Sequence, residues 1–136
     1  MHDLTIGEIK DRVEKLELPS FDLIIGIANG GTVPASLVSY KTGTALRMIK
    51  INFRNEDNNP QHEQPVLLDG VEKNFSNFNL LLIDDVSVTG KTLDLAKSIL
   101  RGNKISTLVF KGKADYVLFP EIDTCVNWPW QIRRKD

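Results

Sequence analysis

The fold is decided by the stretch LLLIDDVSVTGKT, residues 80–92. Its first four residues, 80–83, are apolar without polar alternation, which predicts a buried strand of a parallel sheet. Asp84 and Asp85 come where that strand should end, a short polar turn follows, and residues 92–100 have the pattern of a helix. Ligands bind beyond the carboxyl ends of parallel strands, so this strand–turn–helix unit predicts a binding site.

The residue types in this turn suit a phosphate next to a sugar. Gly90 lets the backbone approach an anion closely, Thr89 and Thr92 can donate hydroxyl hydrogen bonds, and the helix start offers backbone N–H groups. The two carboxylates would repel a phosphate, so we expect Asp84 and Asp85 to face sugar hydroxyls or Mg²⁺, which favours one or two carboxylates plus substrate oxygens. A strand–turn–helix corner without a ligand is the structural alternative. A P-loop is excluded because it requires glycine at position 85.

A second unit of the same kind precedes the first. Residues 21–28 form a near-continuous apolar run, residues 29–32 are a glycine-rich turn, and residues 33–38 read as a helix with Pro34 in its first turn. The turn therefore brings more backbone N–H groups to the same edge of the sheet. A dinucleotide-binding fingerprint is disfavoured because its middle glycine is replaced by Ala28.

The remaining segments complete one α/β domain over residues 1–136. Residues 4–18 predict a packing helix, begun by a capping box of Thr5 and Glu8. Further strands are predicted at 44–53, 65–68, 105–110 and 114–119, and a polar loop at 54–64. Lys50 and Arg54 either face the site or are solvated charges at the sheet edge. His62, alone in the polar loop, is not assigned to the site.

Composition excludes several functional classes. The net charge is −1, whereas a sequence-independent nucleic-acid binder needs a basic face. No apolar run could span a membrane and no signal peptide is apparent, so we expect a cytoplasmic protein with neither nucleic-acid nor membrane partners. The single cysteine, Cys125, excludes an internal disulfide and argues against a zinc site.

The stretch 80–92 resembles the phosphoribosyl pyrophosphate motif of the type I phosphoribosyltransferases: an apolar strand, two acidic residues, a few variable residues and then Thr-Gly-x-Thr. The likeness covers about residues 20–130 and is greatest to the small bacterial xanthine and hypoxanthine-guanine enzymes. It implies a Rossmann-like single-domain parallel sheet flanked by helices, with a small C-terminal hood element. It also implies transfer of a phosphoribosyl group from phosphoribosyl pyrophosphate to a nucleobase, with a purine as the base in a salvage reaction. It further implies a homodimer or higher homo-oligomer and a loop, 54–64, that closes over the site.

The resemblance also implies roles for individual residues. Asp84 and Asp85 would be the catalytic pair, holding the ribose hydroxyls directly or through Mg²⁺. The 5′-phosphate would be bound by Val88, Thr89, Gly90, Lys91 and Thr92. Pyrophosphate would be bound by Ala28, Asn29, Gly30 and Gly31, in a loop that often contains a non-proline cis peptide bond. The base would be bound by Lys111, Cys125 and Val126.

Two departures from the family pattern bear on activity. Asn29 stands where purine members carry a basic residue, which weakens pyrophosphate binding or moves the positive charge to Lys50 or Arg54. Val88 stands where oxopurine members carry an acid, and general acid–base help is typically worth about 10²–10⁴-fold. A catalytically weak or inactive protein that binds phosphoribosyl pyrophosphate or a nucleotide is therefore the alternative. Trp128 and Trp130 either pack in the domain or stack on the base.

Overall fold

The computed structural model describes residues 1–52, 66–69 and 76–132. The helices are α1 (Ile6–Glu14), α2 (Thr32–Thr42) and α3 (Lys91–Ile99). The longer strands are β2 (Leu23–Ala28), β3 (Leu46–Asn52), β4 (Val66–Asp69), β5 (Asn79–Ser87) and β6 (Lys104–Gly112). The two-residue strands are β1 (His2–Asp3), β7 (Tyr116–Val117) and β8 (Val126–Asn127).

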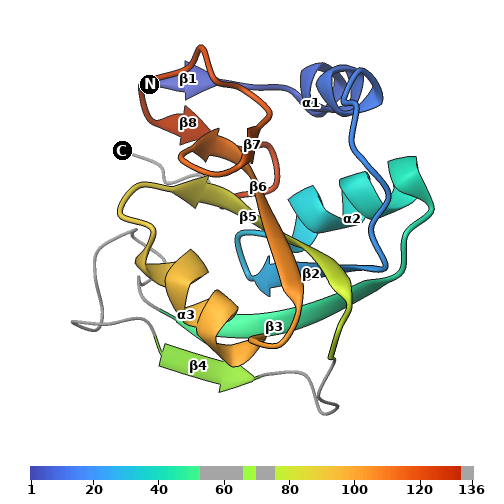
Figure 1. Cartoon of the computed structure of the whole chain (residues 1–136). Helices are drawn as coiled ribbons and strands as arrows, with labels where there is room; N and C mark the ends of the chain where they lie inside the picture. Colours follow the sequence, from blue (N-terminus) through green and yellow to red (C-terminus); the bar gives the residue numbers. More distant parts are fainter. Residues whose placement is uncertain (53–65, 70–75, 133–136) are drawn as a thin grey trace.

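The main sheet has the strand order β4-β3-β2-β5-β6-β7 (Figure 1). Strands β3, β2, β5, β6 and β7 pair in parallel, which confirms the predicted parallel sheet. The edge strand β4 runs antiparallel to β3, an orientation that the sequence pattern did not predict. Strands β1 and β8 form a separate, parallel two-stranded sheet.

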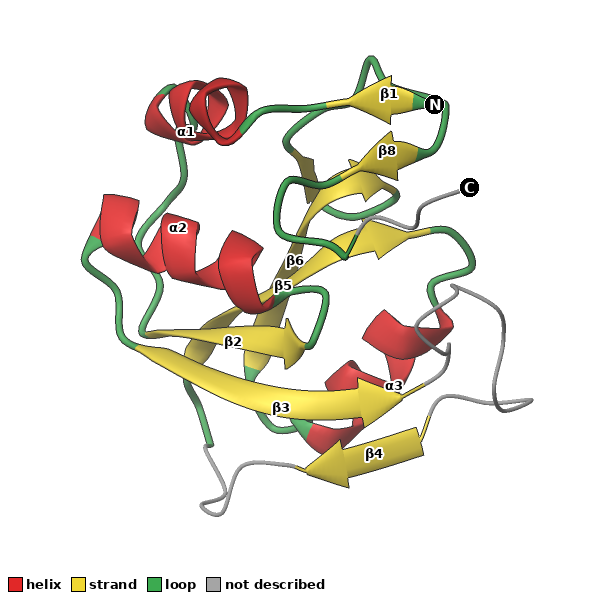
Figure 2. Ribbon diagram, turned by 180° about the vertical axis from the view of Figure 1, so that it is seen from behind, coloured by secondary structure: helices red, strands yellow, loops and turns green. Residues whose placement is uncertain are grey.

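The helices cover both faces of the main sheet, with α1 and α2 on one face and α3 on the other (Figure 2). Alternate residues of β5 supply the two cores. Leu81 and Ile83 join the cluster that contains Ile9 of α1 and Val38 of α2. Leu80 and Leu82 join the cluster that contains α3. A strand buried on both faces explains why residues 80–83 are all apolar.

Several predicted boundaries shift. The capping box of Thr5 and Glu8 is confirmed, but α1 ends at Glu14 instead of residue 18. Helix α2 runs to Thr42, past the predicted end at 38, and stops at Gly43 in the left-handed conformation (φ 71°). Of the strand predicted at 114–119, only Tyr116–Val117 is regular.

One correction affects the site directly: β5 does not end before the acidic pair. It continues through Asp84 and Asp85 to Ser87, because β6 accompanies it as far as the pair Ser87 and Gly112. The predicted loop 54–64, with Arg54 and His62, lies outside the described residues. Within the ranges that the structure describes, no helix has the length and apolar character needed to cross a bilayer.

Candidate active site

The loop after β2 lies against the acidic pair of β5. The two strands are parallel neighbours, so their carboxyl ends meet at one edge of the sheet. A Cβ atom added to Gly30 would lie 2.6 Å from Oδ1 of Asp85, so the glycine backbone is in contact with this carboxyl group. The peptide bond between Ala28 and Asn29 is cis, as the family resemblance implied.

The next glycine fixes where the loop turns into α2. A Cβ atom at Gly31 would lie 2.6 Å from the carbonyl oxygen of Ile27 and 2.7 Å from that of Ile83. The Gly31 N–H donates to the Ile27 carbonyl at 2.7 Å, and α2 begins at the following residue. The loop is therefore packed against the backbone of both strands, and a larger residue at position 31 would displace it.

The acidic pair is largely withdrawn from solvent. Asp84 is 8% exposed and Asp85 is half-buried. Oδ1 of Asp84 accepts the Asp85 N–H at 2.8 Å, and Oδ1 of Asp85 accepts the Val86 N–H at 2.8 Å. Burial raises the pKa of both carboxyl groups, and the negative charge of Asp85 raises the pKa of Asp84 further. The pair therefore favours a cation or hydroxyl donors as its neighbour.

This pair suits Mg²⁺ in one respect. Two adjacent buried carboxylates can be shared with an ion that takes its other ligands from substrate oxygens and water. Among the described residues no group of three or more His, Cys, Asp and Glu side chains forms a metal cluster. The donor set therefore matches an ion that arrives with a phosphorylated substrate better than an ion held by protein ligands alone.

The predicted phosphate loop runs from β5 into α3. Gly90 adopts a left-handed conformation (φ 82°) and is the N-cap residue of α3, which begins at Lys91 rather than at Thr92. Thr89 Oγ1 accepts the Lys91 N–H at 3.3 Å. Val88 is 67% exposed, so its side chain is open to solvent beside the helix start. A helix N-terminus and hydroxyl groups at this position can bind an anion.

Two further polar residues, Lys50 and Ser87, lie close to these loops. Lys50 of β3 is in register with Ala28, the residue that starts the cis peptide bond, and its side chain is exposed. Ser87 is 6% exposed, and its Oγ has no hydrogen-bond partner among the described residues. The sequence pattern placed Ser87 in a short polar turn, and its burial was missed because the strand was expected to end earlier.

The predicted base-contacting residues come from two elements. Lys111 lies near the end of β6, in register with Val86 of β5 and half-buried. Val126 of β8 packs against the cluster that includes Phe110, while the neighbouring Cys125 is exposed. Their assignment to the base stays a prediction.

The structure decides between packing and base stacking for one of the two tryptophans. Trp128 is 1% exposed and meets Phe110 edge-on at 6.0 Å between ring centroids, so the packing interpretation of this residue is correct. Trp130 stacks on Trp128 with centroids 5.3 Å apart and planes 7° apart. Trp130 is half-buried, and within residues 1–52, 66–69 and 76–132 its Nε1 has no hydrogen-bond partner.

Comparisons with known proteins agree with this geometry. The chain is 30% identical over 117 residues to an orotate phosphoribosyltransferase from Sulfurisphaera tokodaii, covering 84% of this chain and 55% of the relative. It thus spans about half the length of the curated relatives that it matches.

Solved structures match over more of their length. A purine phosphoribosyltransferase from Pyrococcus horikoshii superposes with a TM-score of 0.82 at 27% identity, covering 98% of this chain and 96% of that one. A xanthine-guanine-hypoxanthine phosphoribosyltransferase from Helicobacter pylori shares the fold, with a TM-score of 0.69 at 13% identity and coverage of 96% and 93%. The sequence profile of the phosphoribosyl transferase domain matches residues 9–132, and the chain therefore belongs to that family, within the type I fold.

Proposed function

We propose that this chain transfers the 5-phosphoribosyl group of phosphoribosyl pyrophosphate to a nucleobase and releases pyrophosphate. The observation that carries the proposal is the contact between Gly30 and the carboxyl group of Asp85. It puts the candidate pyrophosphate loop and the candidate ribose-binding carboxylates at one sheet edge, where α3 also begins. A phosphorylated sugar with a pyrophosphate group presents the matching chemistry.

Each part of the donor substrate has a proposed partner. The loop 88–92 and the start of α3 bind the 5′-phosphate, and Asp84 with Asp85 accepts hydrogen bonds from the ribose hydroxyls. The loop 28–31 binds pyrophosphate through its backbone. Because Asn29 has no charge, Lys50 beside Ala28 is our candidate for the cation that stabilises the departing pyrophosphate.

Mg²⁺ belongs to the same proposal, with Asp84 and Asp85 as the residues nearest to it. When bound, it would neutralise part of the pyrophosphate charge. The protein residues bind and orient the substrate, so that the bond from C1′ to pyrophosphate breaks and a bond from C1′ to a base nitrogen forms. The proton lost by that nitrogen goes to solvent, since Val88 cannot accept it.

For the base, we propose a purine. The support is the purine enzyme of Pyrococcus horikoshii, which this chain matches over nearly the full length of both. Lys111 also suits an oxo group, because an ammonium group donates hydrogen bonds. A cytoplasmic role in purine salvage and a homo-oligomeric state are parts of this proposal.

Orotate is the second candidate. The curated relatives are named orotate phosphoribosyltransferases, and Val88 favours a base that does not need an acid at this position. A base that carries a carboxylate would also pair with the positive charge of Lys111.

The proposal can be tested with purified protein, phosphoribosyl pyrophosphate, Mg²⁺ and a panel of bases: adenine, hypoxanthine, guanine, xanthine, uracil and orotate. We expect base-dependent release of pyrophosphate in the wild type and a loss of at least about 10³-fold in Asp84→Asn/Asp85→Asn, because this variant keeps the shape of the pair but removes its charge. Lys97→Gln, an exposed change near the end of α3, should leave turnover unchanged. Calorimetric binding of phosphoribosyl pyrophosphate without release on any base would refute the transferase and favour a binding protein with a regulatory role.

A further inference from the structure

Residues near the start of the chain hold the segment that carries the candidate base-binding residues. Strand β1 pairs with β8, and the His2 N–H donates to the carbonyl oxygen of Cys125 at 2.8 Å. The Asn127 side chain donates to Oδ1 of Asp3 at 2.7 Å. Figure 1 shows the two strands side by side. The backbone on either side of Val126 is therefore held by residues 2 and 3.

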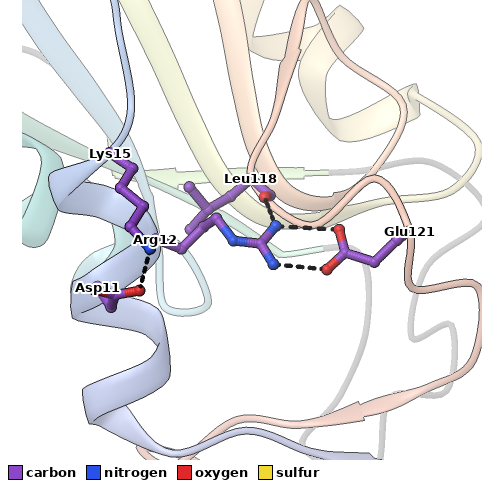
Figure 3. Close-up of polar contacts among 5 residues, drawn as sticks. All are labelled: Asp11, Arg12, Lys15, Leu118 and Glu121. Carbon is purple, nitrogen blue, oxygen red and sulfur yellow. Dashed lines mark hydrogen bonds and ion pairs between the residues drawn. The ribbon is translucent and has the colours of Figure 1, made fainter.

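A second contact holds the same segment nearer to β7. Nη1 of Arg12, on α1, donates to the carbonyl oxygen of Leu118 at 2.8 Å and to Oε1 of Glu121 at 3.1 Å. Nη2 donates to Oε2 of Glu121 at 2.7 Å, so the ion pair is bidentate (Figure 3). The guanidinium carbon also lies 4.5 Å from the ring centroid of Phe119. One side chain thus binds a carbonyl group, a carboxylate and an aromatic ring of residues 118–121.

The position of this contact makes it more than a surface ion pair. An exposed ion pair on its own contributes little to stability. Here, however, the residues between β7 and β8 have no regular helix or strand, and Leu118 and Phe119 are each 3% exposed. Their neighbours in the core include Ile9 and Val13, which flank Arg12 on α1. The start of the segment therefore meets α1 both in the core and through Arg12.

The charges of this contact persist at neutral pH. The hydrogen bonds from Arg12 lower the pKa of Glu121 to about 2, and the same pairing raises the pKa of Arg12. Both groups are ionised throughout the pH range of an activity assay, so the contact is a fixed support rather than a switch.

We propose that Arg12 is a positioning residue for the nucleobase, acting through segment 118–128 on Cys125 and Val126. The inference rests on the proposed transferase activity. Among the described residues, the contacts of the Arg12 side chain across the fold are with residues 118–121, at the start of this segment, and not with the candidate phosphate loops. Its loss should therefore weaken use of the base and leave use of phosphoribosyl pyrophosphate unchanged.

The test compares steady-state constants of Arg12→Gln with those of the wild type, using hypoxanthine and orotate as the varied bases. We expect KM for the accepted base to rise roughly fivefold to tenfold, because the segment that carries Cys125 and Val126 loses its three hydrogen bonds from Arg12. KM for phosphoribosyl pyrophosphate should stay within twofold. Arg12→Lys keeps the charge but not the bidentate geometry, so it should give an intermediate rise.

Lys15→Gln is the matched control. It removes one positive charge from the same helix region, but Lys15 pairs at 2.9 Å with Asp11, four residues earlier, and is exposed. Fluorescence of Trp128 and Trp130, the two tryptophans of the chain, monitors folding of the segment in each variant. Positioning by Arg12 is supported if Arg12→Gln has the same fluorescence spectrum and Tm as Lys15→Gln but a higher KM for the base.

The outcomes separate the two proposals. A wild-type protein that releases no pyrophosphate with any base overturns the proposed function, and this inference with it. If the wild type is active but Arg12→Gln and Lys15→Gln have the same KM for the base, the inference about Arg12 is overturned and the proposed function stands. A parallel rise in both KM values also overturns it, because a general loss of structure would produce that result. If Arg12→Gln does not fold, the same comparisons apply to Arg12→Lys.

Discussion

Replacing Gly30 with alanine tests the contact on which the site assignment depends. The added Cβ would lie 2.6 Å from Oδ1 of Asp85, and 2.8 Å from its Cγ and Oδ2. Overpacking of this kind costs about 1–3 kcal/mol. Turning the carboxyl group aside would also break its 2.8 Å hydrogen bond with the Val86 N–H, worth about 1 kcal/mol. We therefore expect Gly30→Ala to lower the free energy of unfolding by about 2–4 kcal/mol.

A double-mutant cycle isolates the contact from other effects of the substitution. The three atoms nearest to the added methyl group all belong to Asp85, so Asp85→Ala removes the obstruction. In that background Gly30→Ala should lower the free energy of unfolding by less than about 0.5 kcal/mol, which leaves a coupling energy of at least about 1.5 kcal/mol between the two positions. Urea unfolding, followed by circular dichroism, gives the free energy of unfolding of the wild type, of the two single variants and of the double variant.

A control and a contradictory result complete the design. Gly7 lies in the exposed first turn of α1, where an added Cβ meets nothing closer than Thr5 Oγ1 at 3.8 Å. Gly7→Ala should therefore stabilise the protein by up to about 1 kcal/mol. If Gly30→Ala had the same cost with and without Asp85, the glycine loop and the acidic pair would not be in contact. The observation that carries the proposed function would then be wrong.

Three further predictions concern the charges of the site. Burial raises the pKa of Asp84, so its favourable contribution to folding is complete below the ordinary pKa of about 3.9 and is lost as pH rises through the higher folded value. Asp84→Asn should therefore raise the free energy of unfolding at pH 7, and this free energy should fall less between acid and neutral pH in the variant than in the wild type. Urea unfolding at a series of pH values would contradict this if the two proteins gave parallel profiles. Lys50→Gln should weaken binding of phosphoribosyl pyrophosphate about tenfold in calorimetry. Arg47→Gln, on the same strand and also exposed, is the control for that variant, and equal affinities would remove Lys50 from the site. Val88→Asp should raise turnover with hypoxanthine or guanine by about 10²-fold, the lower end of general acid–base help, and a folded variant without any gain would exclude a missing acid as the limit.

The sequence predicted the parts of the fold whose signals are local. Strands β2 and β5 are apolar runs, and the turns that follow them hold contiguous polar and glycine residues, so the two halves of the site could be placed before their contact was known. The end of β5 was misjudged because the apolar run stops at Ile83. Strand pairing follows backbone hydrogen bonds instead, and β6 continues alongside to Gly112. A carboxylate inside a buried strand is unusual in a structural core, which agrees with a functional role for Asp84.

The parts that were missed depend on contacts between distant residues. Strands β1 and β8 have two residues each, too few to show a period, and β1 pairs with β8 from the other end of the chain. The sequence analysis did not single out Arg12, because the pattern of α1 shows which face is apolar but not which residues its polar side contacts. The antiparallel direction of β4 likewise follows from its partner and not from its own residues.

The choice of base is separate from the constraints of folding. Val88 is 67% exposed, so burial gives no reason for an apolar residue at this position, and an acidic side chain would fit there without crowding. Its identity therefore reflects chemistry or the lack of a requirement for it, whereas Gly31 is fixed by its close contacts with the backbone of β2 and β5. Lys111 is placed by the register of β6 against β5, and the segment with Cys125 and Val126 is held by β1 and Arg12. Under the proposed function, base specificity depends on Val88, whose side chain is exposed, and on the segment with Cys125 and Val126, which β1 and Arg12 contact.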